Sequence, residues 1–364
     1  MHPALTPAVL ARLRAPRPYP AVSLVMPTHR REPDNAQDPV RLRNLLAEAK
    51  ERLRADPAVT RERRADVEEQ LDRAHTEVDL AHVEDGLAIF AAPGEHHVWY
   101  LGRTAPERVV LADTFLTRNL VAAREAERPY WVMAVSANRV SLWNGGPERV
   151  TEVYKGGFPL TRSLTAQDVE REERIGDVPS TFTDEATRQF LRGADEAMRH
   201  VLAAAPRPLY VAGEAAALSL LDDAGTVARD ASRVPHGGLA DGPADVVWQA
   251  VRPFRAVHQE AEIGALLQEL DKARGRRDFA AGVDEVWQSA LGGRVGTLAV
   301  EENYRTTVRD DGEHLVPAES GDLDAREDLV DEIVERSLDT DAKVRFVPDG
   351  TLAEQNHIAA VLRY

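Results

Sequence analysis

The residues of this chain that could do chemistry begin with a basic run after an apolar segment. His29, Arg30 and Arg31 follow Val22–Pro27 almost at once. An imidazole can act as a general base, and arginine can bind a phosphate through two parallel hydrogen bonds. The sequence shows no partner that would orient His29. It therefore favours phosphate binding for this run, with general-base catalysis as the alternative.

A second group of basic residues lies on a segment whose apolar residues recur at helical spacing. Arg43, Lys50 and Arg54 stand at i, i+7 and i+11, so they share one helix face beside the apolar stripe. Both groups define the N-terminal basic surface: His29, Arg30, Arg31, Arg41, Arg43, Asn44, Lys50 and Arg54. Such a surface would contact RNA phosphates without reading sequence. A solvated face, partly neutralised by Glu48 and Glu51, fits the pattern equally well.

Other catalytic patterns are weak. The sequence has no phosphate-binding loop, no Gly-x-Ser-x-Gly and no paired-His zinc motif. His96-His97 lies at the start of an expected strand without neighbouring ligands, which favours a structural pair over a metal site. The acidic run 168–173 is local, whereas two-metal chemistry needs carboxylates from several strands. We therefore assign no catalytic residue and expect no metal and no cofactor.

The composition sets the class of protein. A chain of 364 residues is long enough for two or three domains, and it has no cysteine, which excludes disulfides and thiol nucleophiles. The net charge of −16 argues against binding a polyanion over the whole surface, but residues 1–64 hold 13 basic and 7 acidic side chains. No apolar run reaches the roughly 18 residues of a membrane span. We expect a soluble, cytoplasmic protein with no membrane partner.

The elements that position these residues follow from apolar spacing and turn residues. We expect strands at 22–26, 86–92, 98–101, 109–111, 130–136, 139–143, 150–154, 209–212, 295–300, 344–347 and 358–362. We expect helices from 38, over 60–82 and 116–125, from 183, from about 246, and over 279–290 and 329–338. A long loop is expected at 155–183 and an exposed loop at 225–245. The result is a mixed α/β (α+β) protein.

The order of these elements resembles the class 1 release factors of archaea and eukaryotes and their rescue relative Pelota. It resembles more closely the bacterial archaeo-eukaryotic release factor-like families. The resemblance is carried by residues 22–31 with 38–46, 86–90 with 112–115, 132–143, 262–301 and 359–364. It implies a release-factor-like N-terminal α/β domain (1–128), an RNase H-like middle domain (129–257) and an L7Ae-like α/β/α sandwich (258–364). It also places RNA contact on the N-terminal domain.

The family's Gly-Gly-Gln tripeptide, which carries out peptide release, is missing. The four Gly-Gly pairs, which begin at residues 145, 156, 237 and 292, are followed by Pro147, Phe158, Leu239 and Arg294. The resemblance places Gly156-Gly157-Phe158 nearest the loop that faces the peptidyl-transferase centre. A phenylalanine cannot orient water there, and a simple turn also explains the glycines. The codon-reading Asn-Ile-Lys-Ser motif is missing as well.

These features predict a ribosome-associated translation factor without peptide-release activity. It would bind the ribosomal A site through rRNA, and tRNA in addition, during stress, hibernation or rescue. The resemblance also implies a protein partner for the C-terminal domain. Two alternatives stay open: a hydrolase acting on peptidyl-tRNA or RNA, and a stress-related protein-interaction module that never meets RNA.

Overall fold

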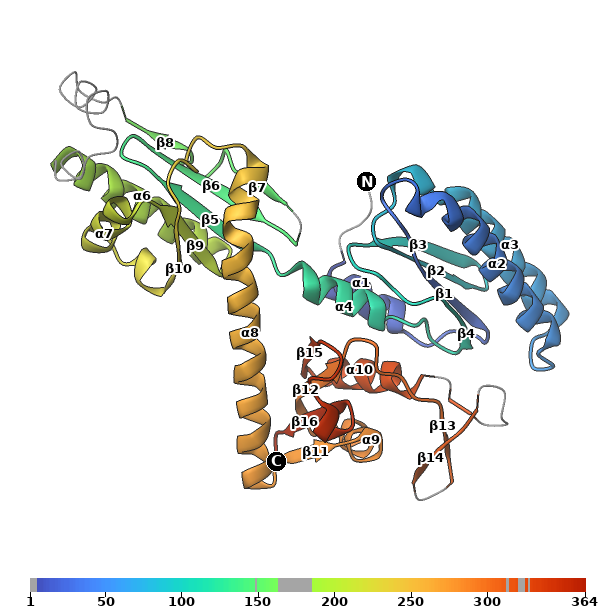
Figure 1. Cartoon of the computed structure of the whole chain (residues 1–364). Coiled ribbons are helices and arrows are strands. Elements are labelled where there is room, and N and C mark those ends of the chain that lie inside the picture. The colour runs from blue at the N-terminus through green and yellow to red at the C-terminus, as the bar shows by residue number, and fades with distance from the viewer. Residues whose placement is uncertain (1–4, 148, 163–184, 312–313, 320–324, 327) are drawn as a thin grey trace. The chain divides into compact units, whose positions relative to one another are not determined.

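Two compact units make up the chain (Figure 1). This computed structural model describes residues 5–147, 149–162, 185–311, 314–319, 325–326 and 328–364. Unit 1 combines Met1–Ala126 with Gly264–Tyr364, and unit 2 is Glu127–Ile263. The mixed α/β class expected from the sequence is confirmed. The division into three domains stays a prediction.

The N-terminal part of unit 1 is an antiparallel sheet in the order β3-β2-β1-β4. Its strands are β1 (Ala21–Pro27), β2 (Gly86–Ala92), β3 (Glu95–Leu101) and β4 (Arg108–Ala112). Its helices are α1 (Pro7–Arg14), α2 (Asp38–Ala55), α3 (Arg61–Glu77) and α4 (Arg118–Glu127), with short turns η1 (Asp34–Gln37) and η2 (Leu80–His82). The predicted stripe of α2, from Leu42 to Leu53, is buried and packs with α3 against one face of the sheet.

The C-terminal part of unit 1 is a mixed sheet in the order β11-β16-β12-β15. Its strands are β11 (Phe279–Ala281), β12 (Val295–Glu301), β15 (Lys343–Val347) and β16 (Ile358–Leu362). It is accompanied by α9 (Val283–Leu291), α10 (Leu329–Asp339), η5 (Ala353–Gln355) and the hairpin β13 (Val308–Asp310) with β14 (Leu315–Pro317). The helix predicted from residue 279 is wrong at its start. Phe279 to Ala281 pair with β16, and Gly282, at φ 76°, begins α9.

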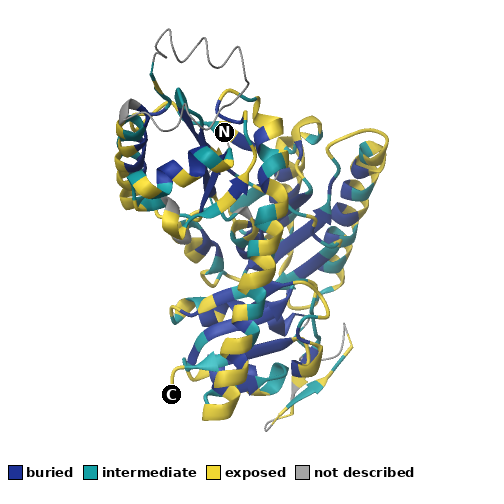
Figure 2. Ribbon diagram, turned by 60° about the vertical axis from the view of Figure 1, so that its left-hand side comes forward, coloured by how far each residue is buried: buried dark blue, intermediate teal, exposed yellow. Residues whose placement is uncertain are grey.

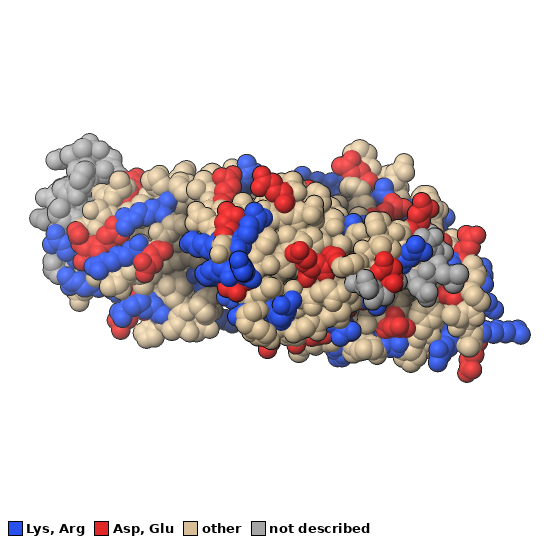
Figure 3. Space-filling view, turned by 90° about the horizontal axis from the view of Figure 1, so that it is seen from below, with Lys and Arg blue, Asp and Glu red and all other residues tan. Residues whose placement is uncertain are grey.

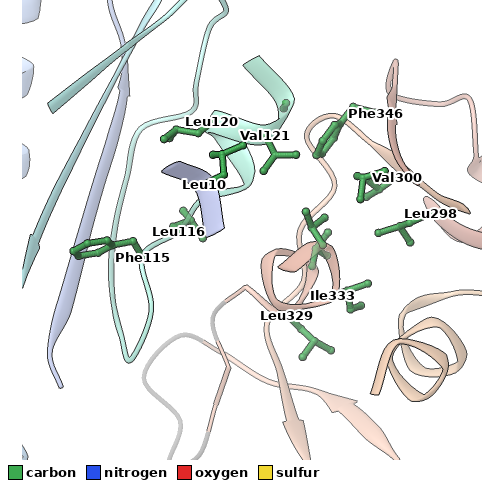
Figure 4. Packing of buried hydrophobic residues seen from close by; sticks show 14 of the residues in the cluster. Leu10, Phe115, Leu116, Leu120, Val121, Leu298, Val300, Leu329, Ile333 and Phe346 are labelled. Carbon is green, nitrogen blue, oxygen red and sulfur yellow. The ribbon is translucent and has the colours of Figure 1, made fainter. Parts of the chain in front are cut away.

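One hydrophobic core joins the two parts of unit 1. It gathers side chains from α1, α4 and the sheet face that α2 and α3 leave uncovered, and packs them against the C-terminal sheet and α10. Figure 4 shows Leu10, Leu116 and Val121 on one side and Ile333 and Phe346 on the other. Segments from the two ends of the sequence therefore share one interior.

Unit 2 is built on a mixed sheet in the order β10-β9-β5-β6-β7, with β8 also paired to β6. Its strands are β5 (Tyr130–Val135), β6 (Arg139–Gly145), β7 (Val150–Glu152), β8 (Leu160–Thr161), β9 (Leu209–Gly213) and β10 (Ser232–Pro235). Helices α6 (Glu185–Ala204) and α7 (Ala215–Ala224) share one core with the sheet, and the start of α8 (Ala244–Arg276) shares another. The sheets are buried while the helices expose their outer faces (Figure 2).

Two loop predictions in unit 2 have different outcomes. The exposed loop at 225–245 is wrong in part, because it contains η4 (Val227–Asp230) and β10, whose Val234 is fully buried beside β9. The loop at 155–183 contains β8, and its residues 163–183 lie outside the described residues. Both segments are rich in turn-forming residues, so the sequence did not predict their short strands.

Candidate nucleic-acid interface

His29 and Asp38 form a pair at the centre of the N-terminal basic surface. His29 follows β1, and Asp38 is the first residue of α2. The Asp38 carboxylate accepts the backbone N–H of His29 at 2.8 Å and lies 3.0 Å from its Nδ1. Asp38 is buried, whereas the imidazole is 39% exposed. The carboxylate thus fixes the ring, and an Nδ1–H tautomer would leave the Nε2 lone pair for a proton or a hydrogen-bond donor.

The other cations near His29 also meet carboxylates. Arg41 donates to Asp38 at 2.9 Å and lies 3.2 Å from Glu107. Arg30 forms a two-pronged pair with Asp85, with both distances at 2.8 Å. Bidentate pairs hold the guanidinium in one orientation. A phosphate that approached Arg30 would therefore compete with Asp85 for the same donors.

The α2 cations repeat this arrangement. Lys50 lies 2.5 Å from Asp72 and Arg54 makes a two-pronged pair with Glu68, both carboxylates coming from α3. The pairing with Glu68 raises the pKa of the Arg54 guanidinium. The Arg43 guanidinium donates to the Pro39 carbonyl at 3.3 Å. The structure thus brings the predicted residues onto neighbouring elements, but with much of their charge neutralised.

Arg31, Arg43 and Asn44 are exposed members of the surface that contact no carboxylate among the described residues. They are the positions at which a phosphate would meet the least competition. Exposed ion pairs contribute about 0–1 kcal/mol each, so phosphate could displace the neighbouring carboxylates at modest cost. RNA contact at these eight residues stays a prediction.

The Gly156-Gly157-Phe158 segment packs against α6. Both glycines have positive φ, 67° and 90°, and a Cβ at Gly156 would lie 3.3 Å from Val201. Phe158 is 4% exposed and belongs to the core shared with Leu191. The glycines thus turn the chain and Phe158 anchors it, which is the turn considered from the sequence. Whether this segment faces the peptidyl-transferase centre stays a prediction.

A buried polar network inside unit 1 was missed by the sequence reasoning. Arg118, at the start of α4, donates to the carbonyls of Glu301 and Glu302 at 3.0 and 2.9 Å. Its backbone N–H donates to Asp331 at 2.7 Å. Arg108 pairs with Asp328, and Thr117 donates to Glu335 at 3.0 Å. The acidic residues recur along α10 at 328, 331 and 335, a helical spacing that could have revealed them.

Burial sets the protonation of this network. Desolvation, reinforced by Asp328, raises the pKa of Asp331 to about 8. Desolvation and the charge of Asp331 raise the pKa of Glu335 to about 9. Burial also lowers the pKa of Arg118. The network links the two parts of unit 1, because Thr117 and Arg118 contact residues 301–335.

No group of three or more His, Asp or Glu side chains in the described ranges is placed to hold a metal ion. The His96 ring lies 2.7 Å from Gln70 and 3.0 Å from Glu77, and His97 lies 3.0 Å from Glu95. These partners give the two histidines structural contacts. Among the residues that the structure describes, no helix is both long enough and apolar enough to cross a membrane.

Residues 129–294 match a family model described as bacterial archaeo-eukaryotic release factor family 3. The archaeal translation termination factor aRF1 is 16% identical, covering 98% of this chain and 96% of its own, at a TM-score of 0.25. Archaeoglobus fulgidus Pelota is 15% identical, covering 76% and 79%, at 0.32. Archaeal Pelota, in a ribosome-bound model with ABCE1, is 12% identical, covering 100% and 95%, at 0.41. No curated protein matches the sequence. The family match spans every strand of unit 2 and continues through α9.

Proposed function

We propose that this release-factor-like protein, matched to the bacterial archaeo-eukaryotic release factor family 3 over residues 129–294, binds the ribosome without releasing peptide. It occupies the A site and acts in stress, hibernation or rescue, with rRNA and tRNA as its contacts. The observation that carries the proposal is the family match in a chain in which no Gly-Gly pair precedes glutamine. A scaffold without its release tripeptide is suited to occupying a site and not to hydrolysis there.

The segment nearest the expected release loop supports a nonenzymatic role. Phe158 replaces the residue that would orient water, and its side chain is held in a core. An exposed polar group at that position would be needed to reach an ester bond. Gly156 and Gly157 retain their positive φ, which a turn alone explains.

The N-terminal basic surface supports contact with rRNA. Its exposed members Arg31, Arg43 and Asn44 can donate to phosphates, and His29 is oriented by Asp38. Binding that relies on phosphates weakens steeply as salt rises, because counterions compete for the backbone. The proposal therefore predicts a salt-sensitive association.

Cosedimentation of the purified protein with ribosomes tests this function. We expect the protein in the ribosomal pellet at about 50 mM salt and a marked loss at about 200 mM. The double variant Arg31→Glu/Arg43→Glu should lose most of the binding at the lower salt. Arg61→Glu/Arg73→Glu, which reverses two exposed cations on α3 with the same change of net charge, is the matched control. Absence of the wild-type protein from the pellet at both salts would reject the proposal and favour a protein-interaction module.

A second candidate is hydrolysis of peptidyl-tRNA, and the His29–Asp38 pair is the observation that favours it. A carboxylate-oriented imidazole is suited to activate water. Incubating purified protein with peptidyl-tRNA would show turnover, and His29→Ala would abolish it. No turnover by the wild-type protein would leave the nonenzymatic function standing.

A further inference from the structure

The topology of the C-terminal sheet brings four strand ends to one edge. β16 is antiparallel to both β11 and β12, and β12 is parallel to β15. The starts of β11, β12 and β15 therefore lie beside the end of β16. Two backbone hydrogen bonds confirm the adjacency: Leu362 N–H donates to Asp278 at 2.8 Å, and Arg363 N–H donates to Arg294 at 2.9 Å.

Every one of these four strand ends carries a basic residue. They are Arg277 before β11, Arg363 after β16, Arg294 before β12 and Lys343 at the start of β15. Arg277, Arg363 and Arg294 lie level on three adjacent strands, about 4.8 Å apart, and Lys343 pairs with Thr297, three residues further along β12, so the four form one group near this edge of the sheet. Such a group of cations can contact several phosphates along a nucleic-acid strand. We call it the basic edge.

The last turns of α8 enlarge the basic edge. Lys272, Arg274 and Arg276 are exposed on this helix end, and Arg274 stacks over Phe279 of β11 at 4.8 Å. Figure 3 looks onto the end of α8, where Lys and Arg atoms gather. Four acidic residues also lie near it: Glu269, Asp271, Asp278 and Asp341. Seven cations against these four leave the edge positive in a chain of net charge −16.

The cations of the basic edge largely keep their charge. Arg294 donates to the Ser289 hydroxyl at 3.2 Å, and Arg363 donates to the Thr340 carbonyl. These acceptors are neutral, so they orient the guanidinium groups without cancelling them. Only Arg276 has a carboxylate partner in the described contacts of this edge, Asp278 at 3.4 Å.

The opposite edge of the same sheet is acidic. Glu301 and Glu302 end β12, and Asp349 follows β15. Glu301 is buried, accepting from Leu352 N–H at 2.7 Å, and Glu302 pairs with Arg103 at 2.9 Å. The sheet therefore separates its charges: carboxylates are engaged inside unit 1 at one edge, and cations stay exposed at the other.

Helix capping explains part of this pattern and leaves part unexplained. Cations stabilise helix C-termini, and Arg363 donates to Thr340, the C-cap of α10. Lys343, however, lies on a strand. Arg277 has φ 67°, at the position after α8 where glycine is favoured because a side chain is strained. An arginine at this positive φ destabilises the backbone relative to glycine, so local structure does not explain why a basic residue stands there.

We infer that the basic edge binds the phosphate backbone of RNA. Five of its seven cations are arginines, whose forked donors match phosphate oxygens. Tyr364, 75% exposed beside Arg363, adds a ring on which an unpaired base can stack. A membrane-binding surface would need a broad apolar face, and the exposed large apolar residues near this edge are Leu291 and Tyr364 alone among those described. This surface is separate from the N-terminal one and adds to the proposed function.

Binding of the full-length protein to a 20-nucleotide RNA hairpin with a single-stranded loop tests the inference by fluorescence anisotropy. The decisive variant is Arg277→Gly/Lys343→Gln. Glycine relieves the positive φ, so the melting temperature should hold or rise. RNA affinity at about 50 mM salt should fall about tenfold, and the slope of log affinity against log salt should shrink by one to two. Arg61→Gln/Arg73→Gln, with the same change of charge, should keep wild-type affinity.

Three results would overturn the inference. The first is wild-type affinity and salt slope in the Arg277→Gly/Lys343→Gln variant. The second is an equal loss in the α3 control. The third is wild-type protein that ignores the hairpin but binds vesicles of anionic lipid or an acidic peptide. The hairpin assay involves no ribosome. Failure to bind the hairpin would therefore overturn this inference without rejecting the ribosome binding that cosedimentation tests. A failure of cosedimentation that spares hairpin binding would reject the proposed function alone.

Discussion

The N-terminal basic surface and the basic edge contain similar residues and differ in what those residues contact. In the first, Arg30, Arg41, Lys50 and Arg54 meet carboxylates from neighbouring elements. In the second, Arg294 and Arg363 meet a hydroxyl and a carbonyl. The same guanidinium is thus neutralised in one region and only oriented in the other. The partner atom, more than the number of basic residues, decides whether a surface attracts phosphate.

The largest loss of stability is expected when an arginine with buried partners is replaced. Arg118→Ala would remove the donor to three carbonyls and leave Asp328 buried without the charge of this guanidinium. We expect unit 1 to lose about 3–5 kcal/mol of unfolding free energy, as measured by denaturant titration. Arg124→Ala, at an exposed position on the same helix, should cost under about 0.5 kcal/mol. Equal losses in the two variants would contradict the role assigned to the network.

Buried carboxyls also predict how stability depends on pH. The folded-state pKa values of Asp331 and Glu335 are raised to about 8 and about 9, so the folded state holds their protons more tightly than the unfolded state does. Their stabilising contribution is complete below their unfolded pKa values, near pH 4, and is lost as the pH rises to 8 and 9. Melting temperatures measured from pH 5 to 9.5 should fall. Asp331→Asn should flatten that fall, and an unchanged profile would count against the raised pKa values.

Removing the carboxylate partners tests directly whether they reduce the affinity of the N-terminal basic surface for RNA. Asp72→Asn/Glu68→Gln would release Lys50 and Arg54 from their α3 partners. Affinity for the RNA hairpin at about 50 mM salt should rise about tenfold, with a salt slope steeper by one to two, because two more cations can meet phosphates. Glu62→Gln/Asp66→Asn, also on α3, makes the same change in net charge without removing a carboxylate that pairs with Lys or Arg in the described contacts. An equal gain in both variants would show that net charge alone governs binding.

The smallest effect is expected on folding. The same Asp72→Asn/Glu68→Gln change should lower the unfolding free energy by less than about 1 kcal/mol per pair, because these ion pairs are exposed. Denaturant titration of the variant and the wild-type protein would measure the difference. A loss above about 3 kcal/mol would mean that these pairs hold α2 to α3, and that the surface is structural.

The sequence predicted the elements whose apolar spacing is regular. The stripe of α2, the strands of the first sheet and most C-terminal elements are confirmed, because burial on one face fixes a helical or alternating pattern. Short strands such as β10 and β11 were missed, since three or four residues are too few to show a period. Their position depends on pairing with strands remote in the sequence.

The sequence could place the basic residues but not their partners. The helical spacing that puts Arg43, Lys50 and Arg54 on one face was visible in the sequence. Their partners Asp72 and Glu68 come from another helix, so the spacing could not reveal them. Asp38 was not recognised as the partner of His29. The basic edge was equally hidden, because its cations are scattered over residues 272–363 and meet only through strand order. Contacts of this kind depend on packing, which a single sequence does not display.

The shared core of unit 1 has a consequence for the order in which the protein matures. The sheet face around Val25 and Phe90 is covered in part by α10 and β15, and both elements are synthesised after unit 2. Unit 2 leaves the ribosome in between, which takes on the order of ten seconds at about 5–20 residues per second. The middle of the chain can therefore finish folding first, while the beginning waits with part of its interior exposed. A nascent chain of this protein therefore exposes part of this apolar sheet face until α10 and β15 emerge.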